Sequence, residues 1–283
     1  MEVEKIHHIH RIVILTLDSL YSGVALHDFV TAFPERIVLI CASKRYGGKY
    51  GSFFAQLRRN WIRSGYKFVN YLSYHFIYYH VFLHFTDLIN IILRRPKKVY
   101  SIRQLAKKFG INTVESTDPN SAEIVAKIRA TEPDLIISVY FDHVIRKPII
   151  NLPKFGVINV HTALLPDYRG PFPPLWPILK KEQKIGVTIQ YVNNERLDAG
   201  PILAQKIFPL IKGESVLGAD CRLVKEGIAL AKEVIIQIEN GHARAVAQEV
   251  HGPGNYYSYP RKADLKHLSV PLVKTRDFVK QYL

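Results

Sequence analysis

Unbroken apolar runs of strand length alternate with helical periods along the first part of the chain. Positions 11–17 and 36–42 are apolar almost throughout, and a stretch of helical character at 24–33 lies between them. Strands that are apolar at every position are typical of a parallel sheet with helices on both faces. This order therefore predicts an α/β unit. Because no GxGxxG loop follows the first run, it does not predict a dinucleotide site.

The same alternation continues downstream and ends in a long apolar helix. We expect helices at 101–109, 120–131, 174–181 and 215–240, and strands at 111–114, 135–139, 156–160, 186–192 and 202–210. Together they predict a doubly wound, mostly parallel α/β sheet, in which ligands bind beyond the carboxyl ends of the strands. The predicted domains are 1–210, with a helical insertion at about 45–100, and 211–283, with a C-terminal helix and an aromatic, turn-rich extension.

The composition is that of a globular protein from a reducing compartment. The chain has 283 residues, of which 48% are hydrophobic, enough to build a substantial core. Its two cysteines, Cys41 and Cys221, lie far apart in apolar or helical surroundings, so we expect buried thiols and no disulfide. The N-terminus carries acidic residues and no secretory pattern, which favours a cytoplasmic protein.

Positive charge is concentrated in one segment. The formal net charge is +15, and residues 44–110 hold 14 Lys or Arg against one acid, Asp87. The rest of the chain is therefore close to neutral. A phosphate-rich partner or an anionic surface is expected to meet this segment.

Asn159 and His161 give the clearest chemical signal. They end the apolar run at 156–161, and because side chains two apart in a strand share a face, the amide and the imidazole should lie side by side. Proline and glycine then form a fixed loop at 164–171. A further acid, Asp198, stands in the Leu-Asp-Ala-Gly turn at 197–200.

These motifs resemble the folate-dependent formyltransferase family, which includes methionyl-tRNA formyltransferase, glycinamide ribonucleotide formyltransferase and the sugar N-formyltransferases. The matching stretches are NVHTALLPDYRG at 159–170, GVT at 186–188 and LDAG at 197–200, within about 133–210. The resemblance implies a Rossmann-like formyltransferase fold with a catalytic domain at 1–210. It also implies N10-formyltetrahydrofolate as formyl donor and catalytic roles for Asn159, His161 and Asp198.

The three residue types suit this reaction. An amine that attacks a formyl carbon creates a developing oxyanion, which needs hydrogen-bond donors, and an ammonium, which needs a proton acceptor. The amide of Asn159 and the imidazole of His161 can donate, and Asp198 can orient the imidazole and take up the proton. His161 alone could be a buried structural histidine, and Asp198 alone could be a turn aspartate. Their combination with Asn159 favours catalysis.

The loop after the strand at 135–139 is implied by the resemblance to hold the folate. This assigns folate contacts to Phe141, His143, Val144 and Ile145. The resemblance also implies folate contacts from Leu164 and Asp198, which belong to the two later motifs. An ordinary strand-to-helix loop is the alternative for 140–145. We predict no metal site, because the histidines at 7–10 and at 80 and 84 lack the accompanying ligands that a metal needs.

The acceptor is predicted to be a small-molecule primary amine, most plausibly that of a nucleotide-linked amino sugar. One alternative is a methionyl-tRNA formyltransferase-like enzyme, which the basic charge favours and the few residues after Pro260 disfavour. Another is a non-catalytic basic protein that binds nucleic acid or membrane, against which the intact Asn159, His161 and Asp198 count.

The insertion combines its positive charge with 14 of the 32 aromatic residues of the chain, between positions 44 and 99. The apolar stretch at 66–93 is interrupted by polar residues, so we do not expect it to span a membrane. Three interpretations remain open: a helical insertion packed on the sheet or against a second copy in a homodimer, a helix lying on an anionic membrane surface, and nucleic-acid binding.

Overall fold

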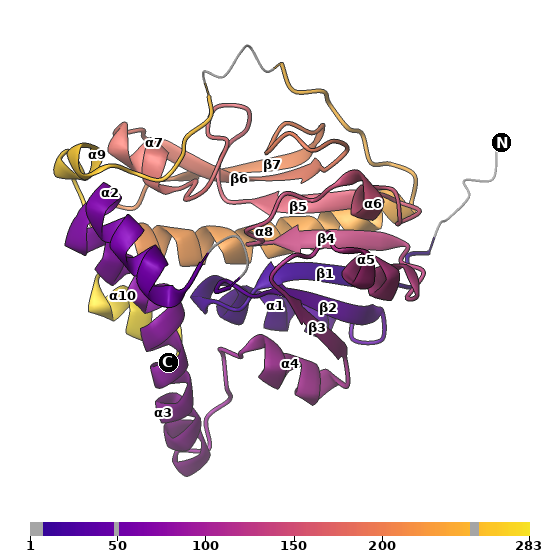
Figure 1. The fold of residues 1–283 in the computed structure, drawn as a ribbon, viewed down its shortest axis with the longest axis horizontal. Helices are drawn as coiled ribbons and strands as arrows, with labels where there is room; N and C mark the ends of the chain where they lie inside the picture. The colour runs from indigo at the N-terminus through magenta and orange to yellow at the C-terminus, as the bar shows by residue number, and fades with distance from the viewer. Residues whose placement is uncertain (1–7, 48–50, 250–254) are drawn as a thin grey trace.

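The structure, a computed structural model, describes residues 8–47, 51–249 and 255–283. In this part of the chain, seven strands form one sheet in the order β3-β2-β1-β4-β5-β6-β7 (Figure 1). The strands are β1 (Ile12–Leu17), β2 (Ile37–Ser43), β3 (Asn112–Ser116), β4 (Leu135–Val139), β5 (Val157–His161), β6 (Lys184–Tyr191) and β7 (Ile202–Pro209). The first five strands in spatial order pair in parallel. Strand β6 pairs antiparallel with β5, and β7 pairs antiparallel with β6. The predicted mostly parallel α/β sheet is confirmed.

Both faces of this sheet are covered, as its unbroken apolar strands predicted. In β1, Ile12 and Ile14 face one core and Val13 and Leu15 face the other. The first core, which we call the main core, contains α1 (Leu20–Ala32), α4 (Ile102–Phe109) and α8 (Val216–Glu239). The second core contains α5 (Ala122–Arg129) and α6 (Lys147–Ile150). Period-two alternation thus supplies two cores from one run of apolar residues.

The first helix starts earlier than the predicted 24–33. Helix α1 begins at Leu20, because the hydroxyl of Ser22 accepts a hydrogen bond from the backbone N–H of Ser19 at 3.0 Å in a capping arrangement. Gly23 is therefore helical and not a turn. It lacks a side chain for a packing reason: a Cβ there would lie 2.7 Å from the hydroxyl of Tyr79.

Both cysteines are buried free thiols, as predicted. Cys41 lies in the strand β2, where burial raises the pKa of its thiol to about 12. Cys221 lies in α8, and burial raises its pKa well above the ordinary value. Both thiols stay protonated at neutral pH, so they are packing residues and not nucleophiles.

Helix α8, the helix expected in the segment 211–283, lies in the main core. It packs on β5, β6, β7 and α1 (Figure 1). The short helices α9 (Lys262–Lys266) and α10 (Thr275–Val279) follow it, and α7 (Leu175–Leu179) precedes β6. Phe278 of α10 is fully buried against the rings of Tyr74 and Phe82, which belong to the insertion.

The insertion is helical, as expected. It consists of α2 (Phe53–Ser73), a π-helical turn at Tyr74–Tyr78 and α3 (Tyr79–Ile92), and it lies along one edge of the molecule (Figure 1). Gly65 interrupts α2 with φ 80°, a conformation that favours glycine. Phe68, Tyr71 and Tyr79 are buried in the main core, so one face of the insertion packs on the fold. Within the described residues, no helix is both long and apolar enough to cross a membrane.

Candidate active site

A cavity of about 410 Å³ opens beyond the carboxyl ends of β1, β4 and β5. We call it the main cavity. It lies where the α/β topology predicted a ligand, and it is lined by both polar and aromatic side chains. Asn159, His161 and Asp198 all line it. Their predicted proximity is therefore observed.

Asp198 is the point at which the three residues meet. Its Oδ1 lies 3.5 Å from Nδ1 of His161 and 3.5 Å from Nδ2 of Asn159. Its Oδ2 accepts a hydrogen bond from the backbone N–H of Gly170 at 2.9 Å. Since all these partners are donors or can become donors, the site is arranged around a carboxylate.

His161 has a defined orientation. It is 5% exposed, and its Nε2 lies 2.7 Å from the carbonyl oxygen of Tyr168. A carbonyl only accepts, so Nε2 carries the proton and Nδ1 of the neutral ring has a free lone pair beside Asp198. If Nδ1 takes up a proton, the carboxylate at 3.5 Å stabilises the imidazolium.

The backbone around Asp198 is strained and firmly held. Asp198 has φ 50°, in the left-handed region. The guanidinium of Arg169 donates from Nε and Nη2 to the carbonyl oxygen of Leu197, at 3.1 and 2.9 Å. Gly170 has φ 106°, and a Cβ there would lie 2.2 Å from the carbonyl oxygen of Tyr257. The loop at 164–171 and the turn at 197–200 thus fix each other.

Two polar residues of β6 complete this site. Gln190 was missed in the sequence, and Thr188 was noted only as part of the GVT stretch at 186–188. Gln190, which pairs with Asn159 across the sheet, donates from Nε2 to Oδ1 of Asp198 at 3.1 Å. Thr188, opposite His161, donates to the carbonyl oxygen of Ala163 at 2.7 Å and so supports the loop after β5. Their signal was available: both are polar residues two apart in an otherwise apolar strand.

Comparison with known proteins identifies the family of this chain. The sequence model of the family described as formyl transferase matches residues 90–235, just over half of the chain. The chain belongs to the formyl transferase family. The matched region of this chain contains β3 to β7 and with them Asn159, His161 and Asp198.

Its curated relatives include two methionyl-tRNA formyltransferases. The protein from Geobacillus sp. (strain WCH70) is 34% identical over 159 residues, which are 56% of this chain and 50% of that protein. The protein from Trichlorobacter lovleyi is 32% identical over 148 residues, 52% of this chain and 46% of that protein. The chain thus spans about half the length of the curated relatives it matches.

Solved structures share the fold at low identity. Glycinamide ribonucleotide transformylase 1 from Symbiobacterium toebii has a TM-score of 0.56 at 17% identity, covering 86% of this chain and 95% of its own. An N-formyltransferase from Helicobacter canadensis, in complex with folinic acid and dTDP-3-aminofucose, has a TM-score of 0.53 at 16% identity. It covers 89% of this chain and 71% of its own.

The predicted folate-contact residues are mostly brought together. Phe141, His143, Val144 and Ile145 all line the main cavity, as does Asp198. The loop presents three apolar side chains beside a carboxylate, which suits a flat heteroaromatic ring with polar edges. Leu164 is placed differently and is not among the described residues that line the cavity. It packs against Gly186 of β6, where a Cβ would lie 2.4 Å from its Cδ2.

A second set of polar residues, to which the sequence analysis gave no role, connects the wall of the same cavity to α8. Asp220 of α8 is fully buried and accepts hydrogen bonds from the hydroxyls of Tyr140 and Thr162, the latter at 3.0 Å. The ring of Tyr140 lies on that of Tyr21, whose hydroxyl is 2.8 Å from Nε2 of His75. His75 comes from the insertion, so this network joins the insertion to the sheet.

Burial determines the ionisation of this second set. It raises the pKa of Asp220 well above its usual range, although the hydrogen bond from Tyr21 lowers it in part. It lowers the pKa of His75 well below its usual range, and the nearby Arg45 adds to this effect. Both groups therefore favour the neutral form.

Replacing Asp220 with asparagine is expected to change how stability depends on pH. The folded protein favours the acid and the unfolded chain favours the carboxylate, so at neutral pH the folded state binds more protons. The contribution of Asp220 is complete below the ordinary aspartate pKa of about 4 and is lost as pH rises toward the folded value, at about 1.4 kcal/mol per unit of pKa difference. As pH rises above about 4, the melting temperatures of the two proteins should diverge progressively in favour of Asp220→Asn. A pH-independent difference would contradict a protonated Asp220.

Proposed function

We propose that this chain transfers a formyl group from N10-formyltetrahydrofolate to a primary amine. The observation that carries the proposal is the convergence of Asn159 and His161 on Asp198, each 3.5 Å away, at the wall of the main cavity. Membership of the formyl transferase family supports it. A non-catalytic binding protein would have no need for a partly buried carboxylate surrounded by donors beside a cavity of this size.

The geometry gives each residue a role. The bound donor supplies the formyl carbon that the amine attacks. The amide of Asn159 offers a donor to the formyl oxygen as negative charge develops there. As the new C–N bond forms, Nδ1 of His161 or the carboxylate of Asp198 accepts the ammonium proton. That proton is then available to the folate nitrogen when its bond to the formyl carbon breaks.

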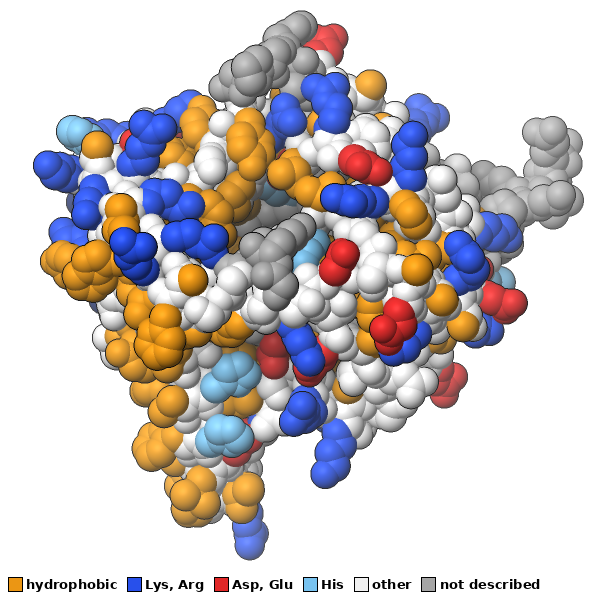
Figure 2. Space-filling view, viewed as in Figure 1, with side chains coloured by type: hydrophobic (Ala, Val, Ile, Leu, Met, Phe, Trp, Pro, Cys, Tyr) orange, Lys and Arg blue, Asp and Glu red, His pale blue; other side chains and the backbone are white. Residues whose placement is uncertain are grey.

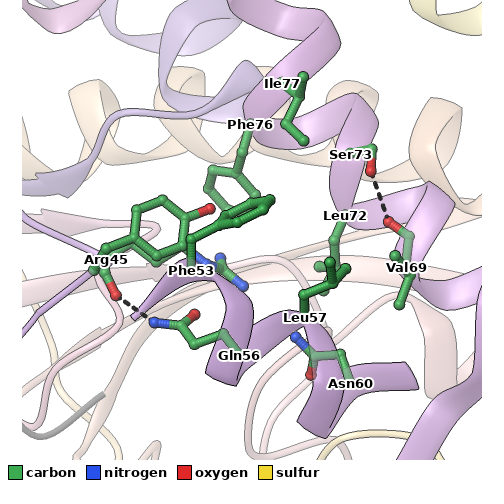
Figure 3. Close-up of a pocket in the computed structure, with 11 residues that line it drawn as sticks. Arg45, Phe53, Gln56, Leu57, Asn60, Val69, Leu72, Ser73, Phe76 and Ile77 are labelled. Atoms are coloured by element: carbon green, nitrogen blue, oxygen red, sulfur yellow. Dashed lines mark hydrogen bonds between the residues drawn. The ribbon is translucent and has the colours of Figure 1, made fainter. Parts of the chain in front are cut away.

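The acceptor side of the cavity favours an anionic molecule. Arg45 follows β2 and lines the main cavity, with its guanidinium 3.9 Å from the centre of the Phe76 ring. Among the described residues, no carboxylate lies within ion-pair distance of it. Its carbonyl accepts a hydrogen bond from Gln56 of α2 at 2.7 Å, beside a smaller pocket of about 40 Å³ that Arg45 and Phe76 also line (Figure 3). Arginine in this position suits a phosphate group.

These features support a nucleotide-linked amino sugar as acceptor. The phosphates would meet Arg45, and the aromatic side chains of Phe76 and Phe172 would border the base or the sugar. The formyltransferase from Helicobacter canadensis, whose structure contains dTDP-3-aminofucose, gives this class of molecule its precedent within the fold. We further propose that the enzyme acts in the cytoplasm and peripherally at a membrane surface.

Initiator methionyl-tRNA is the second candidate acceptor. The sequence relatives named above favour it, since both are methionyl-tRNA formyltransferases. To separate the candidates, purified protein and N10-formyltetrahydrofolate are offered a panel of nucleotide amino sugars and, in parallel, charged initiator tRNA. Mass spectrometry detects the added formyl group. Formylation of a sugar nucleotide alone supports the first candidate, formylation of the tRNA alone supports the second, and formylation of neither contradicts both.

Replacing Arg45 with alanine is expected to raise the KM for a phosphate-bearing acceptor by about tenfold to a hundredfold, since a charge-assisted hydrogen bond contributes roughly 1.5–3 kcal/mol. The KM for the folate should change little. Steady-state kinetics with each substrate varied in turn measures both values. Lys44→Ala, which removes the exposed neighbouring cation, is the matched control. An unchanged acceptor KM in Arg45→Ala would remove the basis for an anionic acceptor.

A further inference from the structure

We propose that the insertion seats the protein on an anionic lipid bilayer through one face of α3, which we call the outer face. It consists of Tyr78, Val81, Phe85, Leu88 and Ile92. Their spacing of three, four, three and four residues places them on one stripe of the helix. Val81, Phe85 and Leu88 are each close to 60% exposed, at 59%, 58% and 59%, and Ile92 is 68% exposed. The proposal does not depend on the catalytic activity.

The opposite face of the same helix is already buried. Tyr79 and Leu83 are in the main core, and the ring of Phe82 lies 5.0 Å from that of Phe278. Helix α3 is therefore apolar on both sides, whereas the described fold covers only one. A contiguous exposed apolar stripe of this kind marks an interaction site.

Basic and aromatic side chains are exposed on α2 and directly after α3. Helix α2 exposes Trp61 and Tyr66 together with Arg58 and Lys67, and Arg94 and Arg95 follow the end of α3. Figure 2 shows hydrophobic side chains along the edge that α3 forms, with Lys and Arg gathered over α2. Tryptophan and tyrosine prefer the depth of lipid headgroups, and Lys and Arg interact with anionic lipids there.

The charge around the outer face is not compensated from within. Asp87 is the only acid between positions 44 and 110, and its carboxylate pairs with Lys97 at 2.5 Å. A second copy of this chain, seated on the outer face, would bring two basic surfaces together at the cost of charge repulsion. Nucleic acid would satisfy the charge but would leave the aliphatic stripe exposed. An anionic bilayer satisfies both, with the helix lying in the interface.

The seat on the membrane and the main cavity are built from one continuous segment. The turn at Tyr74–Tyr78 places His75 and Phe76 at the main cavity and Tyr78 at the start of the outer face. A bilayer that holds α3 would therefore lie beside the acceptor side of the cavity.

Vesicle sedimentation of the full chain tests the proposal. Vesicles of phosphatidylcholine are compared with vesicles that also contain phosphatidylglycerol, at low and at high salt. We expect binding to the anionic vesicles only, weakening as salt rises because the charges are screened. Phe85→Ser combined with Leu88→Ser should reduce the partition coefficient at least about tenfold, since each side chain loses its burial in the interface. Arg94→Glu combined with Arg95→Glu should also reduce it and flatten the salt dependence.

A matched control uses exposed apolar residues elsewhere. Ile207 of β7 and Ile236 of α8 are 58% and 52% exposed, and Ile207→Ser combined with Ile236→Ser should bind vesicles as the wild type does. Circular dichroism checks that each variant is folded. Failure of the wild type to bind anionic vesicles at low salt overturns the proposal, as does equal binding by Phe85→Ser/Leu88→Ser. Self-association in sedimentation velocity that this double substitution abolishes, without vesicle binding, would assign the outer face to a second copy instead.

Discussion

Replacing His161 with alanine is expected to slow formyl transfer by about two to four orders of magnitude, the usual cost of losing a positioned acid–base group. The reason lies in its two contacts. Nε2 is held by the carbonyl of Tyr168 at 2.7 Å, which turns Nδ1 toward Asp198. Alanine removes the proton acceptor and leaves the carbonyl without its donor. The measurement is kcat under saturating N10-formyltetrahydrofolate and acceptor, with KM expected to change much less.

The same substitution at an exposed histidine provides the control. His267 lies at the end of α9 on the surface, so His267→Ala should keep wild-type activity. Because His161 is buried, thermal unfolding must show that His161→Ala remains folded at the assay temperature. Full turnover by a folded His161→Ala protein would exclude the proposed role of the imidazole.

The sheet was largely predictable because its strands are apolar at every position. Ile12 and Ile14 serve one core and Val13 and Leu15 the other, so a single run indicates burial on both faces. The direction of β6 and β7 was not predictable in the same way. Periodicity reports which side chains share a face, but it is the same for a strand that runs parallel or antiparallel to its neighbour.

Asn159, His161 and Asp198 were found because each belongs to a local motif. Gln190 and Asp220 were not, because neither belongs to one of the recognised motifs and the partners of each come from elsewhere in the fold. Gln190 reaches Asp198 only because β6 pairs antiparallel with β5. Asp220 reaches Tyr140 and Thr162 only because α8 packs on the sheet. The alternation in β6 indicates that Thr188 and Gln190 share a face, but the partners on that face depend on tertiary structure.

The composition of the insertion predicted its helices but not which of its residues would reach the main cavity. Charge and aromatic content indicated a helical insertion that packs on the fold or a second copy, lies on a membrane surface or binds nucleic acid, and the structure describes α2 and α3 there. Neither property showed that His75 would line the main cavity, nor that the hydroxyl of Tyr21 would lie 2.8 Å from its Nε2. The π-helical turn at Tyr74–Tyr78 rotates successive residues toward different environments, so a helical period of 3.6 does not place them.

Replacing Asp198 with asparagine is expected to lower kcat by about two to four orders of magnitude and to destabilise the fold by roughly 1–3 kcal/mol. The carboxylate accepts from Gly170 on Oδ2 and from Gln190 on Oδ1, with Asn159 3.5 Å from the same oxygen. An asparagine amide has one oxygen for these donors, and its own NH2 must then face another donor whichever way it is turned. The side chain also loses the charge that stabilises a protonated His161.

Asp167→Asn, at an exposed carboxylate of the neighbouring loop, is the matched control and should retain wild-type activity and stability. Single-turnover rates and urea unfolding measure the two effects separately. Loss of stability without loss of the single-turnover rate would reduce Asp198 to a structural residue.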